Sequence, residues 1–370
     1  MVGVKDAHQE SLIGQAGEVE PVYDKYSLSF FLFDPANHAL HVPQRAGSNG
    51  SELNQRLEKN YLPVAITTFE LSSLSARVTQ KTLATTVGVD QRSVVLTRFR
   101  VELAGVTNTA AAWFCVSISP FGPTGFKRRD RAGRNDDDRR INLLKYLAAE
   151  QRLLINSGWG PTFDSAPASF GVYGNGSSYD PNFYLRFNPF EELRQNGQLN
   201  GRDTAIDYIA GLCSGAFVWP INLSAANPVF TLDVRLPVDD YRDVQDLIEL
   251  RSPAADTLES NNQNYWENKL DGSGLQVDLP PLVRHLFDLF RTCRANLLIL
   301  ADDGEIHPGP TIYDSFWIRD SSVEGVACAL VGDPELSVRQ FGFHYPKAMN
   351  HGGWADFISL NGFIGQGARD

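Results

Sequence analysis

The sequence predicts an antiparallel β-sandwich followed by α-helices. Three observations support this fold class. From residue 26 to about residue 240, strand-like runs follow one another with no long helical pattern between them, which is typical of stacked antiparallel sheets. Beyond Val238 the apolar residues recur at helical spacing. The length of 370 residues is sufficient for two domains that each bury a core.

Strands are predicted where apolar and polar residues alternate. Residues 93–103 show the pattern most clearly, because apolar side chains there alternate with Arg98, Arg100 and Glu102, so that the charges share one face. The other predicted strands are residues 26–33, 61–71, 74–80, 111–121, 215–223 and 228–238.

Three stretches inside this region lack a clear strand pattern. Residues 127–140 mix basic residues with four aspartates, which cancel much of the positive field, so we predict a solvated loop and no polyanion site. Residues 157–200 are rich in glycine, asparagine, proline and aromatic residues, which predicts loops. A glycine-rich stretch can also bind phosphate, but the lysine motif of such a site is not present here. Residues 141–155 fit either a helix or a strand.

Helices are predicted at residues 241–250, 256–270 and 279–301. We therefore expect a sandwich domain at residues 1–240, a helical linker at 241–280 and a second domain at 281–370. The last of these helices is the clearest, because one apolar stripe is formed by Leu282, Leu286, Leu289, Cys293, Leu297 and Leu300. A stripe of that width has to be covered by other helices.

The stretch most indicative of function begins at Tyr313. Tyr313 and Trp317 precede Arg319 and Asp320, which we expect at the start of a helix, because Ser321 begins an S-x-x-E capping box. A carboxylate at a helix N-terminus, a guanidinium fork and two aromatic faces match the hydroxyls and C–H faces of a sugar. The same spacing is also typical of an Arg–Asp pair that only ties a loop to a helix, with the aromatic residues in a core.

The order Tyr-x-x-x-Trp-x-Arg-Asp-Ser resembles the sequence with which glucoamylases and related six-hairpin glycosidases open the second helix of an (α/α)6 barrel. The resemblance is specific over about residues 260–333, and before that only the order of sandwich, linker and helices resembles the bacterial enzymes. It implies that Arg319 and Asp320 hold the hydroxyls of the terminal sugar of an oligosaccharide. Tyr313 and Trp317 would then line the pocket, and the reaction would be inverting hydrolysis of α-glucosides.

The resemblance also implies that the chain is the N-terminal part of a longer enzyme. An (α/α)6 toroid needs many more helices than residues 281–370 can supply, so we expect a truncated toroid. In the family, the catalytic acid and base come from later loops. The catalytic residues are thus expected beyond Asp370, this fragment alone is expected to be inactive, and its uncovered apolar stripe predicts self-association.

Composition excludes several partners. The net charge of −11 and pI of about 5.2 argue against a nucleic-acid partner. No apolar run approaches the roughly 18 residues of a membrane span. The N-terminus lacks an apolar signal region, and the cysteines at 115, 213, 293 and 328 are far apart, so we expect reduced thiols and a cytoplasmic location.

No cofactor or metal is predicted. His344, His351 and Asp356 lie near one another in the sequence but lack the spacing of a metal-binding motif. His285 is expected to pack on its helix. His307 lies shortly before Tyr313 and is the better candidate for a pocket neighbour, although a structural role is the simpler interpretation.

Two other functions fit the same residues. A disaccharide phosphorylase of this fold would replace water with phosphate and keep only the catalytic acid. A non-catalytic carbohydrate-binding module would use the sandwich alone, and its binding would survive the changes Arg319→Ala and Asp320→Ala.

Overall fold

The structure is a computed structural model of the chain. It describes residues 1–5, 7, 9–22, 25–43, 51–104, 109–120, 122–123, 141–156, 158–176, 188–208, 210–239, 241, 243–271, 279–302, 305–310, 316–350, 357–358 and 364–365. At residues 51, 109–110, 316–319, 343–350, 357–358 and 364–365 it describes only the backbone. The predicted charged loop at 127–140 lies outside the described residues.

The chain forms two compact units. The sandwich unit comprises Leu12–Arg56 and Ala65–Leu258, and the helical unit comprises Met1–Ser11, Leu57–Val64 and Glu259–Asp370. None of the described helices is long and apolar enough to cross a membrane.

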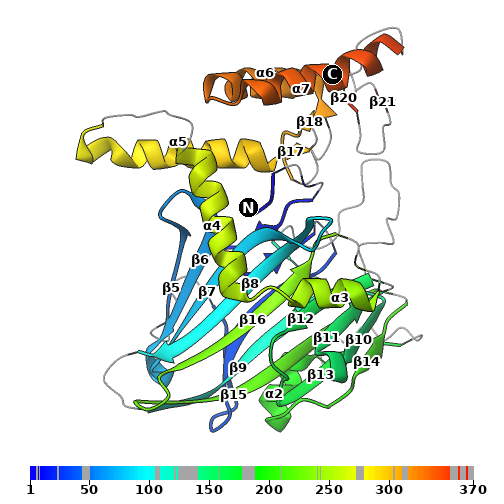
Figure 1. Cartoon of the computed structure of the whole chain (residues 1–370). Coiled ribbons are helices and arrows are strands. Elements are labelled where there is room, and N and C mark those ends of the chain that lie inside the picture. Colours follow the sequence, from blue (N-terminus) through cyan, green and yellow to red (C-terminus); the bar gives the residue numbers. More distant parts are fainter. Residues whose placement is uncertain are drawn as a thin grey trace. The chain divides into compact units, whose positions relative to one another are not determined.

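The sandwich unit is built on two antiparallel sheets (Figure 1). The seven-stranded sheet has the order β1-β2-β3-β9-β15-β13, with β4 paired to β3. Its strands are β1 (Leu12–Ile13), β2 (Val19–Glu20), β3 (Ser27–Asp34), β4 (Ala39–His41), β9 (Thr109–Ser119), β13 (Ser169–Tyr173) and β15 (Ser214–Ser224). The nine-stranded sheet has the order β14-β10-β11-β12-β16-β8-β7-β6-β5. Its strands are β5 (Ser51–Glu58), β6 (Leu62–Leu71), β7 (Ala76–Val87), β8 (Arg92–Leu103), β10 (Leu143–Leu147), β11 (Arg152–Ile155), β12 (Gly158–Phe163), β14 (Thr204–Ile206) and β16 (Val229–Pro237).

Aromatic side chains join the two sheets face to face. The ring centroid of Phe30 on β3 lies 5.4 Å from that of Phe99 on β8, and Phe99 lies 5.0 Å from Phe114 on β9. At the other end of the sheets, Tyr146 on β10 lies 5.0 Å from Phe217 on β15. Tilted and edge-on pairs of this kind bury large apolar areas and fix the spacing of the sheets. The predicted antiparallel β-sandwich is confirmed.

Residues 141–200, where the sequence predicted loops or gave no decision, contain regular elements. Strands β10, β11, β12 and β13 and helix α2 (Pro189–Asn196) lie there, so the loop prediction was wrong in part. Helix α2 has a complete set of end signals. Asn188 Oδ1 accepts a hydrogen bond from the Glu191 N–H at 2.9 Å, Pro189 occupies the first turn, and Gly197 takes the left-handed conformation after the last turn. Leu193 of α2 is buried in a cluster with Phe31 and Val218 of the seven-stranded sheet.

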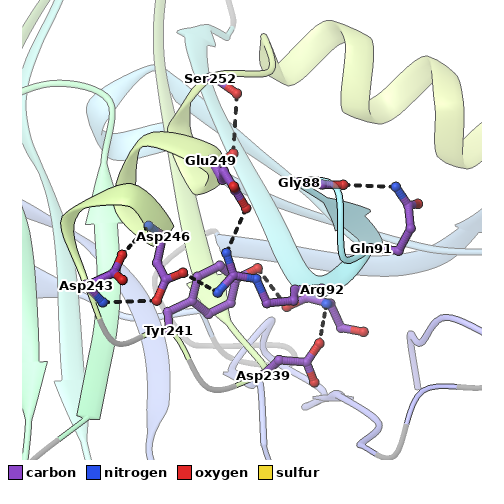
Figure 2. Close-up of polar contacts among 10 residues, drawn as sticks. Gly88, Gln91, Arg92, Asp239, Tyr241, Asp243, Asp246, Glu249 and Ser252 are labelled. Carbon is purple, nitrogen blue, oxygen red and sulfur yellow. Dashed lines mark hydrogen bonds and ion pairs between the residues drawn. The ribbon is translucent and has the colours of Figure 1, made fainter.

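Helix α3 (Val244–Arg251) is fixed to strand β8 through Arg92 (Figure 2). The Arg92 guanidinium donates to Asp246 at 2.5 Å and to Glu249 at 2.7 Å, and it lies 4.4 Å above the ring of Tyr241. Asp243 and Asp246 form a capping box at the start of α3, each accepting the backbone N–H of the other at 3.0 Å. One guanidinium thus satisfies two carboxylates of the helix.

The helical unit contains most of α4 and the elements that follow it. They are α4 (Ala255–Asp271), the short 3-10 helix η4 (Pro281–Val283), α5 (Arg284–Ile299), β17 (Ala301–Asp302), β18 (Glu305–Ile306), β19 (Phe316–Trp317), α6 (Ile318–Leu330), α7 (Pro334–Asn350), β20 (Phe357–Ile358) and β21 (Ile364–Gly365). Within this unit, Arg294 of α5 is buried, donates to Asp333 Oδ2 at 2.8 Å and also donates to the Leu270 carbonyl at 3.3 Å. It therefore ties the end of α4 and the turn between α6 and α7 to α5.

The apolar stripe predicted on α5 is only partly covered. Leu282 of η4 is 85% exposed and Leu286 and Leu289 of α5 are 51% and 57% exposed, whereas Leu298 and Ile299 at the C-terminal end of α5 are buried. On α6 the apolar residues Val323, Val326 and Leu330 are also exposed, while the side of α6 that packs against α7 carries small and polar residues. The predicted exposure of part of the stripe is therefore present in the structure.

Candidate functional site

The candidate site lies where strand β19 runs directly into helix α6. Trp317 ends β19, where it is paired with Phe357 of β20, and Ile318 begins α6, so no loop separates them. Arg319 and Asp320 therefore occupy the first turn of α6, where exposed N–H groups and the helix dipole favour negative charge. Asp320 is partly exposed, as a residue that contacts a ligand must be.

The predicted site residues are described to different extents. Asp320 is described in full. Trp317 and Arg319 are placed in β19 and α6, but their side chains lie outside the described residues, as does the whole of Tyr313. The structure thus places the backbone of Trp317, Arg319 and Asp320 at one strand-to-helix junction. The pocket roles of these three residues and of Tyr313 stay predictions.

The predicted capping box at Ser321 is wrong. Helix α6 begins three residues earlier, at Ile318, and Ser321 lies inside its first turn. The Ser321 hydroxyl donates to the Ile306 carbonyl of β18 at 2.8 Å, and both residues are buried. Gln340 of α7 donates to the Ser321 carbonyl at 2.5 Å. The serine therefore ties α6 to a neighbouring strand, and Glu324 is not needed as its partner.

The β17–β18 hairpin contacts helix α6, and a buried histidine at its end lies between two carboxylates. His307 is fully buried, and its backbone N–H donates to the Leu300 carbonyl at 2.9 Å. Its Nδ1 lies 3.8 Å from Asp302 Oδ2, and its Nε2 lies 3.5 Å from Glu305 Oε2. These separations are longer than hydrogen bonds and give ion pairs only when the imidazole is protonated. The burial of His307 agrees with the structural role and not with a place in an open pocket.

Glu324 is the residue that sequence reasoning did not assign to the site. It lies one turn after Asp320 on α6, and its Oε2 is buried with no hydrogen-bond partner among the described residues. Burial and, to a smaller extent, the negative charge of Asp320 together raise the pKa of Glu324 to about 7, and His307 opposes the rise. The i, i+4 spacing of Asp320 and Glu324 could have revealed this pair from the sequence.

No group of histidine, cysteine, aspartate or glutamate side chains in the described part of the chain could hold a metal ion. His285 is exposed on α5, whereas His351, Asp356 and the His344 side chain lie outside the description. Cys115, Cys213 and Cys328 are buried free thiols and Cys293 is exposed.

A shallow groove lies on the nine-stranded sheet. It is a groove of about 350 Å3 across β5, β6, β7 and β8, lined by Glu52, Asn54, Arg56, Ile66, Thr68, Glu70, Arg77, Thr79 and Glu102. An ion pair between Arg77 and Glu70 crosses it at 2.8 Å. The groove is polar, and no aromatic residue is among those that line it.

No protein-family model matches the sequence, and no curated protein is similar to it. Among solved structures, the chain is similar to a bacterial glucoamylase complexed with acarbose, with a TM-score of 0.64 and 11% sequence identity. The alignment covers 98% of this chain and 52% of the glucoamylase chain. This chain has a glucoamylase-like fold.

The glucoamylase-like chain spans about half the length of the enzyme that it matches. The similarity confirms, at the level of the fold, the resemblance to the N-terminal part of a bacterial glucoamylase. A gh92 family glycosyl hydrolase, ccman5, aligns with 70% of this chain and 26% of its own at 10% identity, but the TM-score of 0.24 is too low to indicate a shared fold.

Proposed function

We propose that this chain is the N-terminal portion of a glycoside hydrolase that acts on the non-reducing end of α-glucosides or other oligosaccharides. The observation that carries the proposal is the glucoamylase-like fold over 98% of the chain, with the Trp-x-Arg-Asp sequence at the junction of β19 and α6. The similar bacterial enzyme is complexed with acarbose, and an oligosaccharide is the ligand that we carry over to this chain.

In this proposal Asp320 accepts hydrogen bonds from sugar hydroxyls at the positive end of α6, and Arg319 beside it donates them. Tyr313 and Trp317 supply flat apolar surface for the C–H faces of the sugar. The catalytic acid and base are not among these four residues. We expect inverting hydrolysis, which requires two carboxyl groups roughly 6.5–9.5 Å apart with room for a water molecule between them.

The proposal is tested by titrating the chain with maltotriose in a calorimeter. Asp320→Asn should weaken binding by about 1.5–3 kcal/mol, which is roughly a 10- to 100-fold rise in Kd, because an amide cannot replace both charged acceptors. The matched control is Glu335→Gln, which neutralises an exposed carboxylate in the first turn of α7. Equal binding by the wild type, Asp320→Asn and Glu335→Gln would contradict the proposed subsite.

A non-catalytic carbohydrate-binding function has one observation in its favour, the polar groove on the nine-stranded sheet. On that alternative, maltotriose binding would survive Arg319→Ala and Asp320→Ala. It would instead weaken when Asn54→Ala and Thr79→Val remove two polar groups from the groove. The two pairs of variants in one titration series separate the functions.

A further inference from the structure

We propose that Glu324 is a positioning residue for Asp320, whose protonated form permits sugar binding and whose ionised form weakens it. The inference rests on the proposed function, because it needs a sugar at Arg319 and Asp320. Glu324 lies one helical turn after Asp320. The inference gives Glu324 a role in sugar binding and predicts that the affinity for sugar depends on pH.

The first argument is position. Asp320 and Glu324 are four residues apart on α6, so their side chains lie on the same side of the helix. Helical side chains lean toward the N-terminus, which directs Glu324 back over the turn that holds Asp320. Two negative charges at this spacing repel one another. A protonated Glu324 removes that repulsion and leaves Asp320 as the only anion of the pair.

The second argument is the surroundings of Glu324, which offer an ionised carboxylate little compensation. Glu324 Oε2 is buried and accepts no hydrogen bond from any described residue. His307 opposes the rise in the pKa of Glu324 when its imidazole is protonated, and His307 itself lies between Asp302 and Glu305. A charge that is deprived of water and poorly paired is costly, so the neutral form is favoured.

The remaining titratable groups around Glu324 do not reverse this balance. On α6 itself, Cys328 lies one turn further on, and burial raises the pKa of its thiol to about 11, so the thiol is neutral. Arg294 of α5 and Asp333 of the following turn act on Cys328, but they are paired with each other at 2.8 Å. On α7 the buried polar side chain that contacts α6 is that of Gln340, which does not titrate.

Sugar binding should therefore be linked to proton uptake. A sugar seated on the first turn of α6 displaces water from the region around Asp320 and Glu324, which penalises the ionised form of Glu324 further. With a pKa of about 7 in the free protein, Glu324 is half ionised at that pH, so binding should take up to about half a proton. Above pH 7 the affinity should fall by up to about tenfold per pH unit.

The experiment is calorimetric titration with maltotriose at pH 7 in two buffers of different ionisation enthalpy. The wild type and Glu335→Gln should take up protons on binding, whereas Glu324→Gln should bind without proton uptake and with an affinity that no longer falls above pH 7. Glu324→Asp keeps an ionisable group and should retain the linkage. A purely structural Glu324 would leave the proton uptake unchanged in Glu324→Gln.

The outcomes distinguish the inference from the proposed function. Absence of maltotriose binding at every pH, or binding that is insensitive to Asp320→Asn, would overturn the proposed function and the inference with it. Binding that depends on Asp320 but takes up no protons, or takes up as many in Glu324→Gln as in the wild type, would overturn only the role of Glu324.

A second measurement tests the titration itself in the free protein. Because folded Glu324 keeps its proton to a higher pH than its ordinary value of 4.5, the folded state binds more protons between about pH 4.5 and 7. The contribution of Glu324 to the stability is therefore greatest below that window and decreases as pH rises through it. Glu324→Gln should remove this decrease in the melting temperature, and an unchanged decrease would contradict the assigned titration.

Discussion

At the scale of single residues, Ser321 shows how a side chain can be placed correctly in the sequence and assigned the wrong role. Its identity and its position after Asp320 suggested a helix cap, but its hydroxyl bonds to Ile306 of β18. The Ser321 hydroxyl bonds to a residue that is distant in the sequence and not to a backbone group of its own helix end. The sequence contains no sign of this distant partner. The first turn of α6, with Arg319 and Asp320, is held in place by this bond.

Ser321→Ala should therefore destabilise the protein. The substitution removes a buried hydrogen bond and leaves the Ile306 carbonyl with one partner fewer, at a cost of about 1–3 kcal/mol. The measurement is thermal unfolding of the variant beside Ser260→Ala, which shortens an exposed serine on helix α4. Equal melting temperatures for the two variants would show that the Ser321 bond does not support the turn.

Only some residues of the candidate site could be predicted from the sequence. The spacing of Trp317, Arg319 and Asp320 was visible in the sequence, and the structure places them at a strand-to-helix junction. The i, i+4 spacing of Asp320 and Glu324 was visible as well, but the burial of Glu324 and its proximity to the buried His307 were not. These two features depend on a hairpin that lies against α6, and such long-range packing has no local signature.

At the scale of elements, the sequence predicted those strands whose two faces differ. Strands β8 and β16 alternate apolar with polar or charged residues in the sequence and were predicted within a residue or two, although Asp233 and Arg235 of β16 are buried. Strands β10 to β13 are short, and β12 contains glycine and proline, so their alternation is weak. Helix α2 was missed even though Asn188, Pro189 and Gly197 mark both its ends, because its eight residues contain few apolar positions to show a period.

Helix α5 provides a prediction at this scale. Leu286 and Leu289 are both more than half exposed and lie one turn apart, so replacing them removes apolar surface from water without opening a core. Leu286→Gln with Leu289→Gln should reduce self-association and dye binding to exposed apolar surface, with a change in unfolding free energy near zero. Sedimentation and thermal unfolding measure the two effects.

The matched control for that pair is Leu298→Gln, which places an amide at a buried position of the same helix. It should destabilise the protein by about 2–5 kcal/mol, because the buried amide loses its hydrogen bonds to water and the apolar packing of the leucine is lost. If the exposed pair destabilised the protein as much as Leu298→Gln does, the exposed face of α5 would be part of a core.

At the scale of the whole molecule, the two units differ in how their chain segments are arranged. The sandwich unit takes nearly all its residues from one stretch of the chain, interrupted only by Leu57–Val64. The helical unit is assembled from three separate segments. Within it, Val2 bridges Ser11, the Tyr61 hydroxyl donates to Asp271 at 3.0 Å, and the Arg291 guanidinium lies 4.5 Å above the Tyr61 ring. The C-terminal helices thus depend on residues that precede them by more than 200 positions in the chain.

This asymmetry predicts that the units respond differently when the chain is divided. A chain of residues 1–258 retains both sheets and the aromatic pairs between them, so it should keep a β-type circular dichroism spectrum and a cooperative thermal transition. Residues 259–370 alone lose Met1–Ser11 and Leu57–Val64, so the Tyr61 contacts to Asp271 and Arg291 are absent, and they should melt without a cooperative transition. Adding residues 1–258 to them should restore helical signal only if the N-terminal segments contribute to that fold. A cooperative transition in residues 259–370 by themselves would show instead that the helices need neither segment, and that the contacts of Tyr61 are incidental.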